Sequence, residues 1–198
     1  MPGFSFPPGF TIPTPRLQIS PFNPTDPAHC TFLVQLWNTE DFISSCGDTG
    51  VTTPEKAASF LENRVLKSYA YYGYGMFLVS RQTDDGVKPV GVVSLLKGIP
   101  PDPHYLAPDI GFAMLPEEGR KGYATEAATA LLEYVKTCLG VDAVFGFCSP
   151  ANQRSRGTLE KLGMEFRGVW PLHILGGEES AVYALPGMSE DLSIYNLD

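Results

Sequence analysis

Residues 115–127 read LPEEGRKGYATEA, and this stretch is the most informative part of the chain. An apolar run predicts a strand that ends at Leu115, and a glycine-containing turn with two cations, Arg120 and Lys121, then opens into a helix of small residues. Free backbone N–H groups and the positive end of the helix dipole make a helix start an anion site. Because glycine lets the backbone approach phosphate oxygens closely, a pyrophosphate suits this turn better than a lone carboxylate.

Other uses of such a turn can be compared with the sequence. The chain has no GxxxxGK[ST] loop, which excludes a Walker-type phosphate loop, and no GxGxxG, which disfavours dinucleotide binding. An ordinary glycine-containing turn between a strand and a helix, without a ligand, remains an alternative.

Outward from this stretch, hydrophobic periodicity predicts an α/β (α+β) fold, a mixed twisted sheet with helices on both faces. Residues 38–51 are polar and contain glycine, which predicts a loop, and Thr52 with Glu55 predicts a capping box at the start of the second helix. We expect helices at 26–37, 52–65, 122–139 and 151–162, and strands at 16–22, 76–80, 90–96, 109–115, 143–148, 164–174 and 180–185.

The length of 198 residues fits one domain. Residues 1–15 carry five prolines and predict an N-terminal arm that is either disordered or packed along the domain. We expect the domain itself to span residues 16–186 and the polar tail, residues 187–198, to be loose.

Composition limits the function. A formal charge of −8 disfavours a nucleic-acid partner. The four cysteines show no CxxC spacing and the three histidines are far apart in sequence, so we expect no metal site. The N-terminus does not look like a signal peptide and no apolar run could span a membrane, so we expect a cytoplasmic protein.

A second stretch follows the next predicted strand. Residues 152–164 read NQRSRGTLEKLGM. Together with KGYATEA at 121–127, its Asn152, Ser155 and the LEKLG of 159–163 resemble the GNAT N-acetyltransferase superfamily, in particular the RimJ/RimL-like branch. In that branch the turn usually carries a glycine where this chain has Arg120, as if Gly119 and Arg120 were swapped.

The resemblance implies the acyl-CoA N-acyltransferase fold of GNAT proteins and acetyl-CoA as co-substrate. The strands at 109–115 and 143–148 are expected to splay apart, so that the pantetheine arm bonds to strand backbone and the pyrophosphate to the turn. The residues expected to bind acetyl-CoA are Met114, Leu115, Arg120, Lys121, Gly122, Tyr123, Ala124, Thr125, Asn152 and Ser155.

Amine acetylation needs a neutral amine, a polarised carbonyl and a proton for the leaving thiolate. By position, Asp109 is the best carboxylate for a base, although a strand-start residue that faces solvent is the alternative. The Met114 N–H can polarise the carbonyl. The resemblance assigns the thiolate donor to Ser155, whose alternative role is to satisfy local backbone at a helix start. Leu159 stands where many GNAT enzymes carry a tyrosine acid.

The resemblance favours an N-acetyltransferase that moves an acetyl group from acetyl-CoA to a primary amine, on a small molecule or a protein N-terminus. Direct transfer in a ternary complex is the usual route of the superfamily, and no histidine or carboxylate neighbours Cys148 to activate it as an acyl carrier. A non-catalytic acyl-CoA-binding module on the same fold is the alternative. No nucleic-acid or membrane partner is expected, and a monomer and a homodimer both remain open.

Overall fold

The computed structural model describes residues 3–84, 86–100, 105–173 and 176–197. Within these residues, eight strands form one sheet in the order β1-β2-β3-β4-β5-β6-β8-β7, with both parallel and antiparallel neighbours. The strands are β1 (Ile12–Pro13), β2 (Leu17–Pro21), β3 (Met76–Thr83), β4 (Gly86–Leu96), β5 (Asp109–Met114), β6 (Phe145–Cys148), β7 (Glu165–Pro171) and β8 (Glu179–Ala184).

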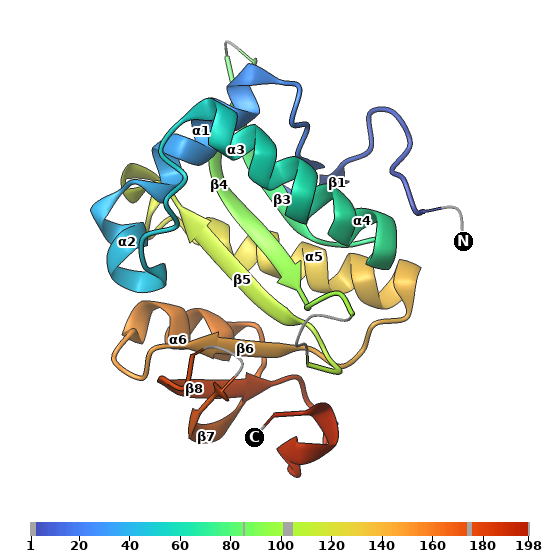
Figure 1. Ribbon diagram of the computed structural model, residues 1–198, viewed down its shortest axis with the longest axis vertical. Helices are drawn as coiled ribbons and strands as arrows, with labels where there is room; N and C mark the ends of the chain where they lie inside the picture. The colour runs from blue at the N-terminus through green and yellow to red at the C-terminus, as the bar shows by residue number, and fades with distance from the viewer. Residues whose placement is uncertain (1–2, 85, 101–104, 174–175, 198) are drawn as a thin grey trace.

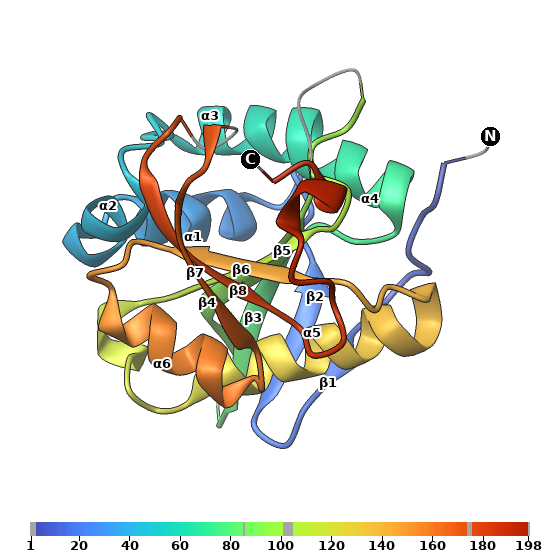
Figure 2. The ribbon, with the colours of Figure 1, turned by 90° about the horizontal axis from the view of Figure 1, so that it is seen from below.

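Helices cover both faces of the sheet, which confirms the predicted fold class. Figure 2 shows α1 to α4 on one face and α5 and α6 on the other. The helices are α1 (Pro27–Trp37), α2 (Glu40–Cys46), α3 (Pro54–Phe60), α4 (Leu66–Tyr72), α5 (Tyr123–Leu139) and α6 (Gln153–Lys161), with a π-helical segment η1 (Leu61–Val65) and the 3-10 turns η2 (Pro116–Glu118) and η4 (Leu192–Tyr195).

Local chemistry sets the helix ends. Asp26 caps α1 by accepting a hydrogen bond from the Ala28 N–H, with Pro27 in the first turn. The α5 helix ends at Gly140, whose φ of 69° is the left-handed conformation that glycine adopts without strain. No helix among the described residues is both long and apolar enough to cross a bilayer.

Three expectations from the sequence were wrong. The segment 38–51 is not wholly a loop, because it contains α2, which Thr39 caps. The cap of α3 is Thr53, which accepts from the Lys56 N–H, and not Thr52. The tail is not loose, because Leu192 and Leu197 are buried in a second core cluster.

The N-terminal arm packs along the domain. The Phe4 N–H donates to the Ala70 carbonyl at 2.9 Å. The Phe6 ring lies 5.1 Å from the ring of Tyr69, and the Phe10 ring lies 5.4 Å from that of Tyr134. These contacts bring the arm against α4 and α5, and the chain then enters β2 beside the start of α5.

Candidate active site

β5 and β6 touch at one end and part toward the other. In the described residues these parallel strands share one register pair, Asp109 with Phe145, and the Phe145 N–H donates to the Pro108 carbonyl at 2.8 Å. Figure 1 shows them diverging toward their carboxyl ends. The splay expected from the sequence is therefore present, and it leaves one edge of β5 without a strand partner along most of its length.

The register with β4 decides which backbone groups of β5 face the gap. The Leu115 N–H donates to the Val90 carbonyl at 2.9 Å. Because backbone groups alternate in direction along a strand, the N–H groups of Met114 and Phe112 point away from β4, toward the gap. The Met114 N–H thus faces the gap, whereas the Leu115 N–H is bound within the sheet. The Phe112 N–H also faces the gap, although the sequence does not single it out.

The turn after β5 is exposed to solvent and leads into backbone N–H groups without an intrahelical partner. Arg120 has a φ of 62° and Gly122 a φ of 79°, so two residues of the turn are left-handed. Among the described residues no side chain caps the first turn of α5. The first N–H groups of a helix have no partner within it, so the amides of Tyr123, Ala124 and Thr125 remain available to an anion.

Arg120 occupies the left-handed position that a glycine usually takes. Gly119, in contrast, is extended, with φ −64° and ψ 158°. The swap inferred from the sequence therefore places conformational strain on Arg120.

Glu118 forms ion pairs with three cationic side chains beside this turn. Its side chain is 2% exposed, and Lys121 Nζ donates to it at 2.7 Å, with Arg81 Nε at 3.4 Å and Lys88 Nζ at 3.7 Å. Burial would raise the pKa of Glu118, but Lys121 and Arg81 outweigh it, so the pKa lies below its usual value. Lys121, predicted as a phosphate ligand, is in this structure bound to Glu118.

Asn152 and Ser155 lie at the start of α6. Asn152 caps this helix, because its Oδ1 accepts from the Ser155 N–H at 3.1 Å. A pocket of about 350 Å³ lies between this helix start and α2. The carboxyl ends of parallel strands share one edge of a sheet, so Asn152 follows β6 at the same edge where the turn follows β5.

Asp109 lies at the other end of β5, where the two strands meet. Residues opposite each other on neighbouring strands point to the same face, so Asp109 shares a face with Phe145. Gly146 faces α6, since a Cβ there would lie 2.4 Å from Leu159 Cδ2, and Phe145 therefore faces away from α6. Asp109 is half-buried, and burial raises the pKa of its carboxyl to about 7 despite a bond from its own backbone N–H, which lowers it.

Comparison with known proteins decides the family. The profile described as Acetyltransferase (GNAT) domain matches residues 16–165. The chain belongs to the GNAT acetyltransferase family. The uncharacterized N-acetyltransferase YnaD of Bacillus subtilis (strain 168) is 35% identical over 71 residues, which are 36% of this chain and 42% of YnaD. The chain thus aligns with less than half of that relative.

Solved GNAT structures share the fold. An acetyltransferase (GNAT family) from Bacillus anthracis superposes with a TM-score of 0.69 and 24% identity, covering 89% of this chain and 98% of the other. RimL, a ribosomal L7/L12 alpha-N-protein acetyltransferase in complex with coenzyme A, gives a TM-score of 0.71 and 19% identity, covering 88% and 97%. At these identities the likeness concerns the fold.

Two side chains near the expected site are poor candidates for proton transfer or for carrying the acyl group. Leu159, at the place of the frequent GNAT tyrosine, is 1% exposed and packs on Gly146. Cys148 is half-buried, and burial raises the pKa of its thiol, with Arg156 opposing, which disfavours the thiolate. His104, which the sequence places in the loop before the 109–115 strand as a candidate to line an acceptor pocket, lies outside the described residues.

Metal ligands do not cluster in the part of the chain that the structure describes: no three His, Cys, Asp or Glu side chains there come together to hold an ion.

Proposed function

We propose that this protein is an N-acetyltransferase that transfers an acetyl group from acetyl-CoA to a primary amine by direct transfer in a ternary complex. The acceptor is a small molecule or a protein N-terminus. The RimL neighbour is named for acetylating a ribosomal protein, which makes a protein N-terminus a specific candidate.

One observation carries the proposal: an unpaired strand edge leads directly into an amide-lined turn. The N–H groups of Phe112 and Met114 face the gap between β5 and β6, and the turn with Gly122 follows at its open end. An extended amide-containing arm attached to a pyrophosphate fits this arrangement, because the arm can bond like an added strand while the phosphates meet the helix start. Asn152 would bond the arm from the β6 side.

Bound acetyl-CoA would supply an activated acetyl group as a thioester. Asp109 is the base that would take the proton of the amine, directly or through water, since a carboxyl with a pKa of about 7 is matched to proton transfer near neutral pH. Asp109 and Met114 are five residue steps apart along the strand, about 16 Å at the usual rise. The Phe112 N–H, closer to Asp109, therefore suits the carbonyl better than the Met114 N–H does.

Ser155 would donate a hydrogen bond to the departing thiolate. It lies in the first turn of α6, where the helix dipole also stabilises negative charge. Its own N–H is already bound to Asn152 Oδ1, which leaves the hydroxyl to act independently of the cap.

A steady-state assay of thiol release from acetyl-CoA tests this function, with a panel of primary amines and N-terminal peptides. We expect release that depends on an amine and double-reciprocal lines that intersect, as a ternary complex requires. Parallel lines would contradict direct transfer. Binding of CoA without release on any acceptor would instead support the non-catalytic module, which the leucine at position 159 motivates.

A further inference from the structure

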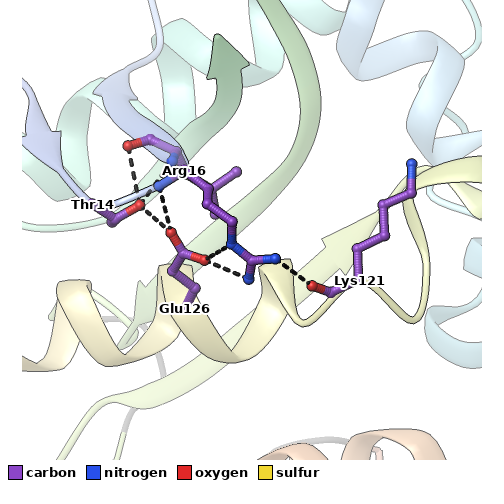
Figure 3. Close-up of polar contacts among 5 residues, drawn as sticks. Thr14, Arg16, Lys121 and Glu126 are labelled. Carbon is purple, nitrogen blue, oxygen red and sulfur yellow. Dashed lines mark hydrogen bonds and ion pairs between the residues drawn. The ribbon is translucent and has the colours of Figure 1, made fainter.

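Several polar contacts join the segment before β2 to the start of α5 (Figure 3). Glu126 accepts from Thr14 Oγ1 at 2.5 Å, from the Arg16 backbone N–H at 2.9 Å and from Arg16 Nε at 2.6 Å. Arg16 Nη2 lies 2.6 Å from the same carboxylate, and Nη1 donates to the Lys121 carbonyl at 2.9 Å. One guanidinium thus links a helix residue to the turn that precedes the helix.

Arg16 lies against the end of the turn and the first residue of α5. Besides the bond to Lys121, its Nη2 lies 3.4 Å from where a Cβ of Gly122 would be, and its guanidinium carbon lies 4.9 Å from the centre of the Tyr123 ring. No side chain caps α5 among the described residues, and the Arg16 contacts hold the end of the turn from the side of β2, in addition to the ion pair of Lys121 with Glu118. Glu126 holds the Arg16 side chain in place, because its carboxylate accepts from Nε and pairs with Nη2 of the guanidinium.

The bond to Lys121 also sets the direction of the next amide. In a trans peptide the C=O and the N–H of the same unit point in opposite directions. Since the Lys121 carbonyl points to Arg16, the Gly122 N–H points away from Arg16. An anion at the start of α5 on that side would meet this amide as well.

We propose that Arg16 is a positioning residue, which holds the turn 119–122 in the conformation that binds the pyrophosphate of acetyl-CoA and is itself held by Glu126. This inference rests on the proposed function. Arg16 acts here through geometry, since Glu126 neutralises its charge.

A purely electrostatic role makes the opposite prediction for Glu126. If charge alone governed binding, Glu126→Gln would remove a negative charge beside the anion site and tighten the binding of CoA. If Glu126 holds Arg16 in place, the same change weakens binding. The sign of the effect therefore separates the two roles.

The test is calorimetric titration of CoA into wild type, Arg16→Met, Arg16→Lys and Glu126→Gln. We expect all three variants to bind CoA about tenfold to a hundredfold more weakly, since a small misplacement of a binding group has effects of this size. We expect Arg16→Lys to weaken CoA binding as much as Arg16→Met does. A lysine ammonium cannot bond the Glu126 carboxylate and the Lys121 carbonyl at once in the way the planar guanidinium does. Arg167→Met, which breaks a 2.7 Å ion pair with Glu165 on β7, is the matched control and should leave CoA binding unchanged.

Backbone ¹⁵N relaxation at Gly122 without ligand gives a second readout, which does not depend on binding. We expect a lower order parameter in Arg16→Met than in wild type and no change in Arg167→Met. Tighter or unchanged CoA binding in Glu126→Gln, with wild type binding CoA, would overturn the positioning role alone. Failure of wild type to bind CoA would overturn the proposed function and this inference with it.

Discussion

Asp109 of β5 lies opposite Phe145 of β6 where these two parallel strands meet, and beyond this pair the strands part. The pair places a carboxyl at the closed end of the gap and on the sheet face away from α6. The same end of the gap is covered by the tail, whose Tyr195 ring lies 5.2 Å from that of Phe145. Partial burial of the Asp109 carboxyl at this position raises its pKa to about 7.

Asp109 should control the pH dependence of activity. A base must be ionised, so we expect kcat/KM to rise with pH with a midpoint of about 7, the pKa of Asp109. Asp109→Asn should lower kcat about a hundredfold or more and remove this limb of the profile. Asp142→Asn, an exposed aspartate just before β6, is the control and should leave the profile unchanged.

The same carboxyl should affect stability in the opposite direction. Its pKa is raised in the folded state, so its contribution is fully present below the ordinary pKa of 3.8 and is lost as the pH rises through about 7. Urea unfolding of wild type from pH 4 to pH 8 should therefore show a decline that Asp109→Asn lacks. Equal slopes for the two proteins would contradict the burial of an ionisable Asp109.

Glu118 should stabilise the fold through its cations. Glu118→Gln leaves Lys121, Arg81 and Lys88 without their shared carboxylate, and we expect the free energy of unfolding to fall by about 2 kcal/mol at pH 7. Because the pKa of Glu118 is lowered in the folded state, this difference should shrink as the pH falls through that lowered pKa. The exposed Glu117→Gln is the matched control, and an equal effect in both variants would argue against the cluster.

Arg120 should carry backbone strain that a glycine would relieve. Its φ of 62° is unfavourable for a residue with a Cβ. Arg120→Gly and Arg120→Ala both remove the charge, and only glycine removes the strain, so we expect the glycine variant to be about 1 kcal/mol more stable than the alanine variant in urea unfolding. Equal stabilities would show that the left-handed conformation costs the chain nothing.

The sequence predicted the turn between β5 and α5 because its signals are local. A strand, a glycine turn and a helix of small residues occur within residues 109–139, and each follows from spacing and capping. The α2 helix was missed because it is seven residues long and buries none of them, so no apolar stripe marks it.

Other features could not be predicted because they depend on which residues meet in the folded chain. That Leu115 bonds Val90, and leaves Phe112 and Met114 to face the gap, depends on strand register, which a sequence does not fix. The contacts of Arg16 with Glu126 join residues 110 positions apart. The tail was expected to be loose because its composition is polar, but Met188, Leu192 and Leu197 are buried.

Calorimetric titration of CoA into wild type, Gly122→Trp and Gly140→Trp tests the anion-binding turn most directly. Gly122 and Gly140 are both left-handed, with φ of 79° and 69°, and they lie at opposite ends of α5, so the two variants carry similar backbone strain. We expect micromolar binding, about −8 kcal/mol, in wild type and Gly140→Trp, and none in Gly122→Trp. No binding of CoA by wild type, or equal binding by the two variants, would contradict a pyrophosphate site at the start of α5.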